Sequence, residues 1–164
     1  MTPYQQFLLE TLRAQERELA GLIEFFPAGH LDQPLRKGDW STREHMNHVR
    51  MVERRYRDRL QGIVAGDETV PPPVRNRPPG EGEPIGDMVA GYRDARQSAI
   101  GLFEALAPPA WNRVFNHPTI WGDVTVEWWA ERMVQHTAEH LETLWMMRQL
   151  WGVPAAVREA AWAV

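Results

Sequence analysis

Apolar residues recur along most of the chain at intervals of three, four and seven positions, the spacing of one face of an α-helix. The pattern predicts four long helices, at about residues 2–26, 40–65, 85–106 and 125–150. The first places Leu8, Leu12, Leu19 and Ile23 on one stripe. Strict apolar/polar alternation is not recognised over any length, so we expect no sheet. Four amphipathic helices of this size indicate an all-α four-helix bundle with antiparallel or near-antiparallel helices.

Local signals mark where these helices begin and end. Ser41 followed by Glu44 is a capping box, in which each side chain satisfies a free backbone N–H of the first turn. Residues 66–84 hold six of the 13 prolines and form a long connection. This is not a domain boundary, because neither half of the chain could bury its helices alone. A short C-terminal helix, at about 155–162, completes a single domain over residues 1–164.

Composition narrows the class of protein further. The formal net charge of -4 gives no overall attraction to nucleic acid or to an anionic membrane. No apolar run reaches the ~18 residues that a membrane span needs, and the N-terminus lacks the pattern of a signal peptide. We therefore expect a cytoplasmic protein. The absence of cysteine excludes disulfides and a thiol nucleophile of the protein's own. Eight tryptophans and seven methionines suggest apolar surface for a homodimer.

Three histidines form the candidate chemical site. His136 and His140 are four residues apart on an apolar stripe of the fourth helix, so they lie one above the other on an inward face. His48 lies on an inward face of the second helix. Three imidazoles suit zinc, nickel, iron or copper. They also leave one coordination position open, as in catalytic sites. The alternative is that these histidines only satisfy buried hydrogen bonds.

Other polar residues near this cluster have two interpretations each. We expect His45 at the surface, with a place beside the metal ligands as the alternative. Glu44 is favoured as a helix cap over a catalytic base. An open side of the site is expected to be lined by some of His117, Trp121 and Trp129. Each ligand is expected to donate its second ring nitrogen to a carboxylate, a carbonyl or water.

Two segments resemble a known family. Residues 40–48, WSTREHMNH, resemble the W-S-x-x-E-x-x-x-H segment of the DinB/YfiT-like metalloenzyme family, and residues 136–140, HTAEH, resemble its later H-x-x-x-H. The resemblance covers nearly the whole chain. It implies a four-helix bundle with an unusual handedness of connection, a metal held by His48, His136 and His140, and frequent homodimers. Some relatives are transferases or isomerases that depend on a low-molecular-weight thiol.

Two functions from different classes follow. The first is a metal-dependent enzyme acting on a small-molecule substrate, with zinc as the expected ion and nickel or iron as alternatives. The ion would activate a low-molecular-weight thiol for transfer or isomerisation, or else water for hydrolysis. The second is a non-enzymatic bundle that binds a small ligand or acts as a scaffold, with a structural metal or none. Neither substrate nor thiol is specified by any segment of the sequence.

Overall fold

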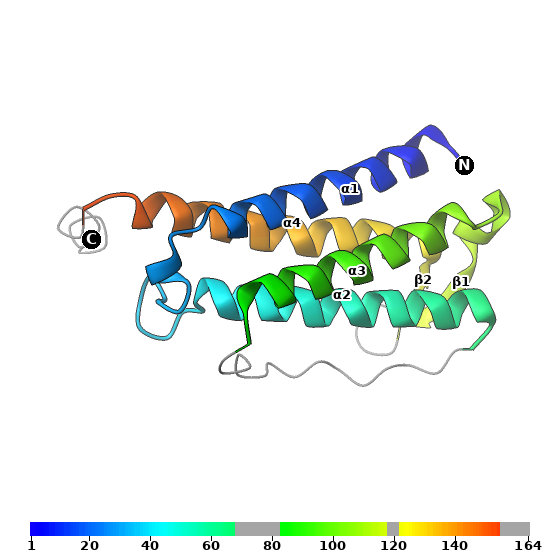
Figure 1. The fold of residues 1–164 in the computed structure, drawn as a ribbon. Helices are drawn as coiled ribbons and strands as arrows, with labels where there is room; N and C mark the ends of the chain where they lie inside the picture. Colours follow the sequence, from blue (N-terminus) through cyan, green and yellow to red (C-terminus); the bar gives the residue numbers. More distant parts are fainter. Residues whose placement is uncertain (68–82, 118–121, 155–164) are drawn as a thin grey trace.

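The chain forms a four-helix bundle, as predicted, with a small hairpin near one end (Figure 1). The computed structural model describes residues 1–67, 83–117 and 122–154. Its helices are α1 (Pro3–Glu24), α2 (Thr42–Ala65), α3 (Ile85–Glu104) and α4 (Val126–Trp151), with short 3-10 turns at Ala28–His30 and Pro108–Asn112. All four helix ranges lie within two residues of those predicted. The predicted helix at 155–162 lies outside the described residues.

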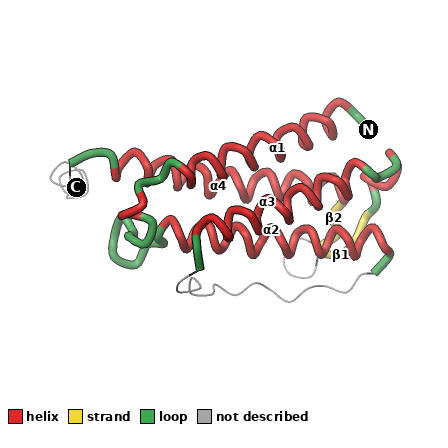
Figure 2. Tube along the Cα trace, in the orientation of Figure 1, coloured by secondary structure: helices red, strands yellow, loops and turns green. Residues whose placement is uncertain are grey.

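Neighbouring helices run in both relative directions (Figures 1 and 2). α1 packs against α3 and α4, and α2 packs against the same two helices. α1 and α4 are parallel: the Gln5 amide donates to Glu127 at 2.9 Å, and the Trp145 indole donates to Glu18 at 2.7 Å. α2 and α3 are parallel as well. The prediction of an antiparallel arrangement is therefore wrong for these two pairs, because an apolar stripe specifies the buried face and not the direction of its neighbour.

The helix ends are held by the capping interactions that the sequence predicts. The Ser41 hydroxyl accepts from the Glu44 N–H at 3.2 Å, and the Glu44 carboxylate accepts from the Ser41 N–H at 2.7 Å. At the other end of α2, Gly66 adopts a left-handed conformation with φ of 83° that favours glycine. Thr125 caps α4 by accepting from the Trp128 N–H at 3.1 Å. These caps fix the depth of His48 and His136 in the bundle.

The expectation of no sheet is wrong. Strands β1 (Val114–His117) and β2 (Gly122–Thr125) form an antiparallel hairpin between α3 and α4. Phe115 pairs with Val124 in the register, and both side chains are buried in the core. Each strand has only four residues, so the alternation was too short to be recognised. The hairpin is stabilised by the helices it covers rather than by its own length.

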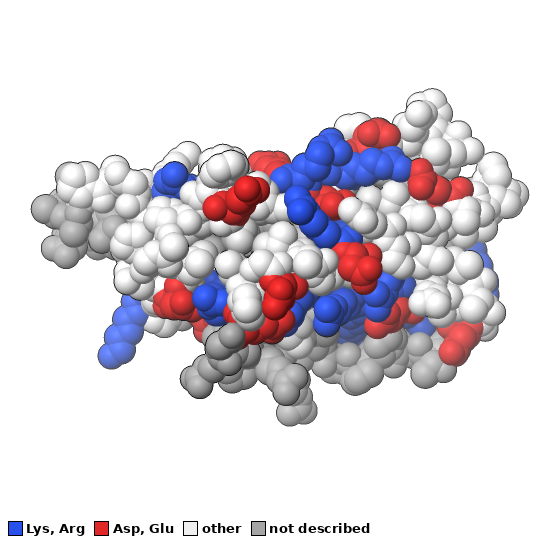
Figure 3. Space-filling view, viewed as in Figure 1, with Lys and Arg blue, Asp and Glu red and all other residues white. Residues whose placement is uncertain are grey.

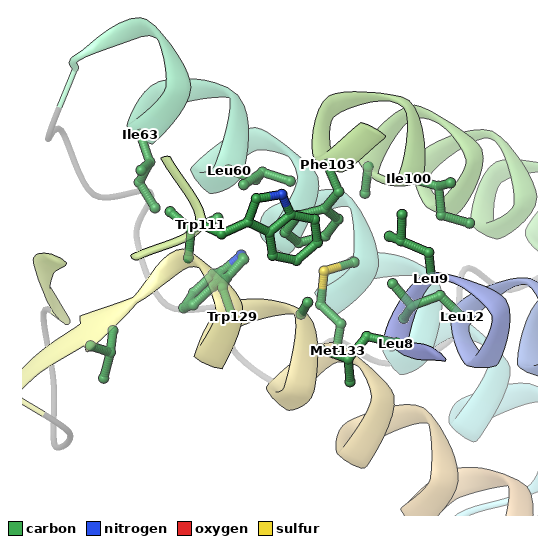
Figure 4. Packing of buried hydrophobic residues seen from close by; sticks show 14 of the residues in the cluster. Leu8, Leu9, Leu12, Leu60, Ile63, Ile100, Phe103, Trp111, Trp129 and Met133 are labelled. Atoms are coloured by element: carbon green, nitrogen blue, oxygen red, sulfur yellow. The ribbon is translucent and has the colours of Figure 1, made fainter. Parts of the chain in front are cut away.

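Two apolar clusters fill the bundle, one toward each end. The first lies beside the hairpin, where Trp111 stacks on Phe103 with ring centroids 5.2 Å apart (Figure 4). The second lies at the opposite end and is built mainly from Leu19, Leu22, Ile23, Phe26, Met46, Val49, Met88, Tyr92, Leu141, Leu144 and Met147. Polar side chains lie between the two clusters, and the histidines are among them.

The surface carries charges of both signs. On the face drawn in Figure 3, basic and acidic side chains lie next to each other over the helices. The Arg13 guanidinium, for example, bonds Glu104 across α1 and α3 at 2.5 Å. Within the described ranges, no helix has the length and apolar character that would let it cross a membrane.

Candidate metal centre

The structure brings the three predicted histidines together. α2 and α4 face each other in antiparallel directions, so His48 meets the stripe that carries His136 and His140. One ring nitrogen of each residue lies within 4.8 Å of the others. The Nε2 atoms of His48 and His136 are 3.3 Å apart. The three side chains thus point at one position between the two helices.

This spacing fits a single metal ion. Two nitrogens bound tetrahedrally to zinc at about 2.1 Å lie about 3.4 Å apart, and no two ligands of one ion lie more than about 4.2 Å apart. The His48–His136 separation of 3.3 Å already matches the tetrahedral value. The largest separation in the set, up to 4.8 Å, is slightly longer than one ion can span. A small side-chain rotation is enough to bring all three nitrogens within bonding distance of the ion.

Burial keeps the imidazoles neutral, the form that binds metal. Burial lowers the pKa of His136 to about 3, with the neighbouring His140 and His48 adding to the effect. It likewise lowers the pKa of His140 to about 3, with His45 and His48 contributing. Burial also lowers the pKa of His48. Near neutral pH the cluster therefore offers lone pairs instead of positive charges.

His136 lies deepest in the cluster, on the side of the hairpin. The Tyr56 ring packs edge-on against it with centroids 5.8 Å apart. Its Nδ1 is buried and has no hydrogen-bond partner among the described residues, so no carboxylate or carbonyl accepts from it there, and the expected water partner stays a prediction. Trp129 is a core residue that donates from its indole to the Tyr56 carbonyl at 3.1 Å. It therefore lies behind Tyr56 rather than at an open side of the site.

His45 belongs to the site, and the expectation of a surface position is wrong. Its Nδ1 lies 2.9 Å from Nδ1 of His140. Burial lowers the pKa of His45 to about 4, and the nearby His48 contributes. His45 is offset by about 60° around α2 from His48, and on the pattern of α2 alone this offset places it outside the buried face. Here α4 crosses at that point and places His140 against it. Hydrogen bonding from a metal-binding histidine to an outer partner fixes its tautomer and ring orientation.

Trp40 covers the cluster from the segment that precedes α2. Its ring centroid lies 4.9 Å from that of His48 and, in a stacked arrangement, 6.3 Å from that of His140. The amino-acid pattern assigns Trp40 no role beyond the motif that contains it. The signal that could have indicated this role is the position of Trp40, two residues before the start of α2. A large aromatic side chain at that position can fold back over the first turns of the helix.

The remaining candidates are less involved. Glu44 is occupied in the capping box, which confirms its structural role. Glu139, next to His140 in the chain, is exposed to solvent. The side chain of His117, and Trp121, lie outside the part of the chain that the structure describes. The expectation that they line the site therefore stays a prediction.

A buried ion pair lies next to the histidines. Arg96 of α3 contacts both carboxylate oxygens of Glu53 of α2, at 2.7 and 2.9 Å, and donates to the Thr137 hydroxyl of α4 at 2.6 Å. All three side chains are fully or almost fully buried. Thr137 follows His136 in the chain, so this network ties three helices together one residue from the metal cluster.

The fold and the cluster define a four-helix bundle with three histidines on two facing helices, a recurring place for metal sites in bundles. The model of the DinB superfamily matches residues 11–144. The chain therefore belongs to the DinB superfamily. A comparison with curated protein sequences finds no match.

Two solved structures share the fold. YfiT from Bacillus subtilis, described as a probable metal-dependent hydrolase with an unusual four-helix bundle topology, superposes with a TM-score of 0.82 and 16% identity, covering 94% of this chain and 91% of its own. TT2238, described as a four-helix bundle protein, superposes with a TM-score of 0.66 and 22% identity, covering 87% of this chain and 98% of its own. At these identities the likeness shows the fold alone.

Proposed function

We propose that the chain is a metal-dependent enzyme that holds one divalent transition-metal ion through His48, His136 and His140, with zinc preferred and nickel or iron as alternatives. The observation that carries the proposal is the convergence of three neutral imidazoles within 4.8 Å. Three protein ligands leave a position for a small molecule, as in catalytic zinc sites. When bound, such an ion supplies Lewis acidity, which lowers the pKa of a water or a thiol at that position.

The chain's own residues prepare this position. Trp40 and Tyr56 cover the histidine rings from two sides and restrict the access of water to them. His45 holds the ring of His140 in place through the contact between their Nδ1 atoms. The capping box of Ser41 and Glu44 fixes where α2 starts, and thereby the depth of His48. A rigid surround of this kind is what a reactive metal position needs.

The nucleophile comes from outside the protein. With no cysteine in the chain, a thiol-dependent transfer or isomerisation uses a low-molecular-weight thiol as co-substrate. Hydrolysis by water is the second candidate, favoured by the description of YfiT as a probable metal-dependent hydrolase. Assaying the zinc-loaded protein on electrophilic substrates with and without added thiols distinguishes the two. Turnover that needs the thiol favours transfer, and turnover without it favours hydrolysis.

Metal binding is the direct test. We expect the metal-free protein to bind one zinc ion. His136→Ala or His140→Ala should weaken zinc binding by more than ~10–100-fold, the loss that follows when a residue hydrogen-bonded to a metal ligand is replaced. The helical signal in circular dichroism stays unchanged, because most of the core is apolar. His30→Ala is the matched control: His30 stacks on Trp151, away from the cluster. Failure of the wild-type protein to bind zinc, nickel or iron contradicts the proposal, and a bound metal without turnover supports the non-enzymatic alternative.

A further inference from the structure

A pocket of about 360 Å³ lies beside the histidine cluster, between the segment before α2 and the last turns of α4. This volume is at the lower end of the range for small-molecule sites, about 300–1,000 Å³. The wall combines apolar side chains with a few polar ones, chiefly Leu35, Asp39, Trp40, His45, Thr143 and Met146. The three histidines of the candidate metal centre are not among its lining residues.

Two wall residues connect the pocket to that centre. Trp40 packs on the rings of His48 and His140, at centroid distances of 4.9 and 6.3 Å. His45 contacts His140 through the two Nδ1 atoms, 2.9 Å apart. The pocket therefore adjoins the cluster from outside, on the Nδ1 side of His140.

A metal ion on His140 fixes where the protons lie along this contact. If Nε2 of His140 binds the ion, its neutral ring carries the proton on Nδ1 and donates it to Nδ1 of His45. His45 is then an acceptor at Nδ1 and carries its own proton on Nε2. The two nitrogens lie on opposite sides of the imidazole ring, so this Nε2–H is directed away from His140. Because His45 lines the pocket, it offers the pocket a hydrogen-bond donor.

The other residues that line the pocket indicate which kind of ligand accepts a hydrogen bond from His45. Asp39 contributes a carboxylate, which accepts hydrogen bonds and repels anions. Trp40, Leu35 and Met146 provide an apolar surface that suits an aromatic or aliphatic body. A ligand with a carbonyl oxygen beside an N–H group accepts from His45 through the oxygen and donates to the Asp39 carboxylate through the N–H. A neutral amide with an apolar body has this combination, and a carboxylate does not.

We propose that this pocket binds a small neutral amide with an apolar body, and that amide and metal strengthen each other's binding through the hydrogen bond between His45 and His140. The coupling rests on the proposed metal site, whereas the pocket does not. In the metal-free protein the shared proton lies on either ring, so His45 is a fixed donor only when the ion is bound. Coupling between two sites is reciprocal, and a factor of five is at the low end of the usual ~5–150-fold range.

The probe is 4-fluorobenzamide, followed by ¹⁹F NMR titration against the zinc-loaded and the metal-free protein. We expect about fivefold tighter binding to the zinc-loaded form. His45→Phe should abolish this difference and His45→Gln should restore part of it, because glutamine also accepts and donates. His30→Phe, outside the site, is the matched control. In the metal-free protein 4-fluorobenzoate should bind more weakly than the amide, and Asp39→Asn should narrow that gap.

The outcomes separate this proposal from the metal site itself. If zinc binds but the affinity for the amide is the same with and without it, the coupling is overturned and the metal site stands. If the amide binds neither form, the pocket assignment is overturned. If no zinc binds while the metal-free protein still prefers the amide over the benzoate in an Asp39-dependent way, the metal proposal fails and the pocket assignment is supported.

Discussion

At the scale of single residues, the site depends on histidines that lose their usual basicity through burial. His136 and His140 have folded-state pKa values of about 3, and His45 of about 4, against an ordinary value of 6.5. The same burial that makes these rings good metal ligands makes their protonation costly. An acidic medium therefore opposes both the metal and the folded state.

This predicts a pH dependence of the stability of the metal-free protein. The pKa of each histidine is lower folded than unfolded, so between about pH 6.5 and 3 the unfolded chain binds more protons. The free energy of unfolding therefore falls as pH falls through this window. His136→Leu should reduce the slope by up to about 1.4 kcal/mol per pH unit. Urea unfolding in the presence of a chelator from pH 7 to 4.5 measures it.

The control for this prediction is Met133→Leu, a buried position on the same stripe of α4 that does not titrate. It should shift the free energy of unfolding at every pH and keep the wild-type slope. Equal slopes in the wild type and His136→Leu would show that His136 is protonated alike in the folded and unfolded states.

Residue identity alone predicted part of the site. The spacing of His136 and His140 places them on one face of α4. His48 could be predicted as the third ligand because it lies on the apolar, inward face of the helix that packs against α4. His45 was missed, because its place depends on how α2 and α4 cross, which neither helix encodes by itself. The contribution of Trp40 depends in the same way on the path of the loop that precedes α2.

At the scale of secondary-structure elements, the start of α2 controls the position of His48. Ser41→Ala removes the side chain that accepts from the Glu44 N–H, so we expect a loss of about 0.5–2 kcal/mol in stability. Glu44→Gln keeps an acceptor for the Ser41 N–H and should leave both stability and zinc affinity close to wild type. Thermal unfolding and zinc titration measure these effects. Loss of turnover in Glu44→Gln with unchanged zinc affinity would assign Glu44 a role beyond capping.

The helices were predicted well because their ends carry explicit signals, such as the capping box at Ser41 and the glycine at position 66. The hairpin was not, because strands β1 and β2 hold four residues each and owe their stability to the pairing of Phe115 and Val124 over the core. Helix direction was predicted wrongly for α1 with α4 and for α2 with α3. An amphipathic pattern is the same whichever way the neighbouring helix runs.

At the scale of the whole molecule, a polar layer separates the two apolar clusters. The ion pair of Glu53 and Arg96, bonded to Thr137, lies in this layer beside the histidines. Glu53→Gln removes the charge that balances the buried guanidinium, and we expect a loss of about 3–5 kcal/mol in stability. Replacing both partners by methionine should cost less, because no buried charge then remains. Chemical denaturation of both variants is the measurement, and an equal or larger loss in the double variant would contradict the prediction.

Association is a second property at this scale, and we propose a homodimer. Phe25 is 73% exposed and Trp145 43%, and both line one groove between the ends of α1 and α4. Sedimentation velocity at micromolar concentration should give twice the monomer mass of 18.9 kDa. Phe25→Asp should shift the equilibrium to the monomer, whereas Val64→Asp, at the opposite end of the bundle, should not. A clean monomer for the wild type would contradict the proposal.

The parallel packing of α1 and α4 has a consequence for how the chain is made. Tyr4 of α1 bonds Glu131 of α4, 127 positions further along the chain, and α1 packs on α3 and α4 rather than on α2. When the N-terminal half leaves the ribosome, the apolar stripe of α1 therefore has neither of its two covering helices. It stays exposed until most of the chain has been synthesised, and exposed apolar surface is what chaperones bind and what drives aggregation. The bundle topology thus leaves the apolar stripe of the first helix uncovered for longer than that of any other helix in the bundle.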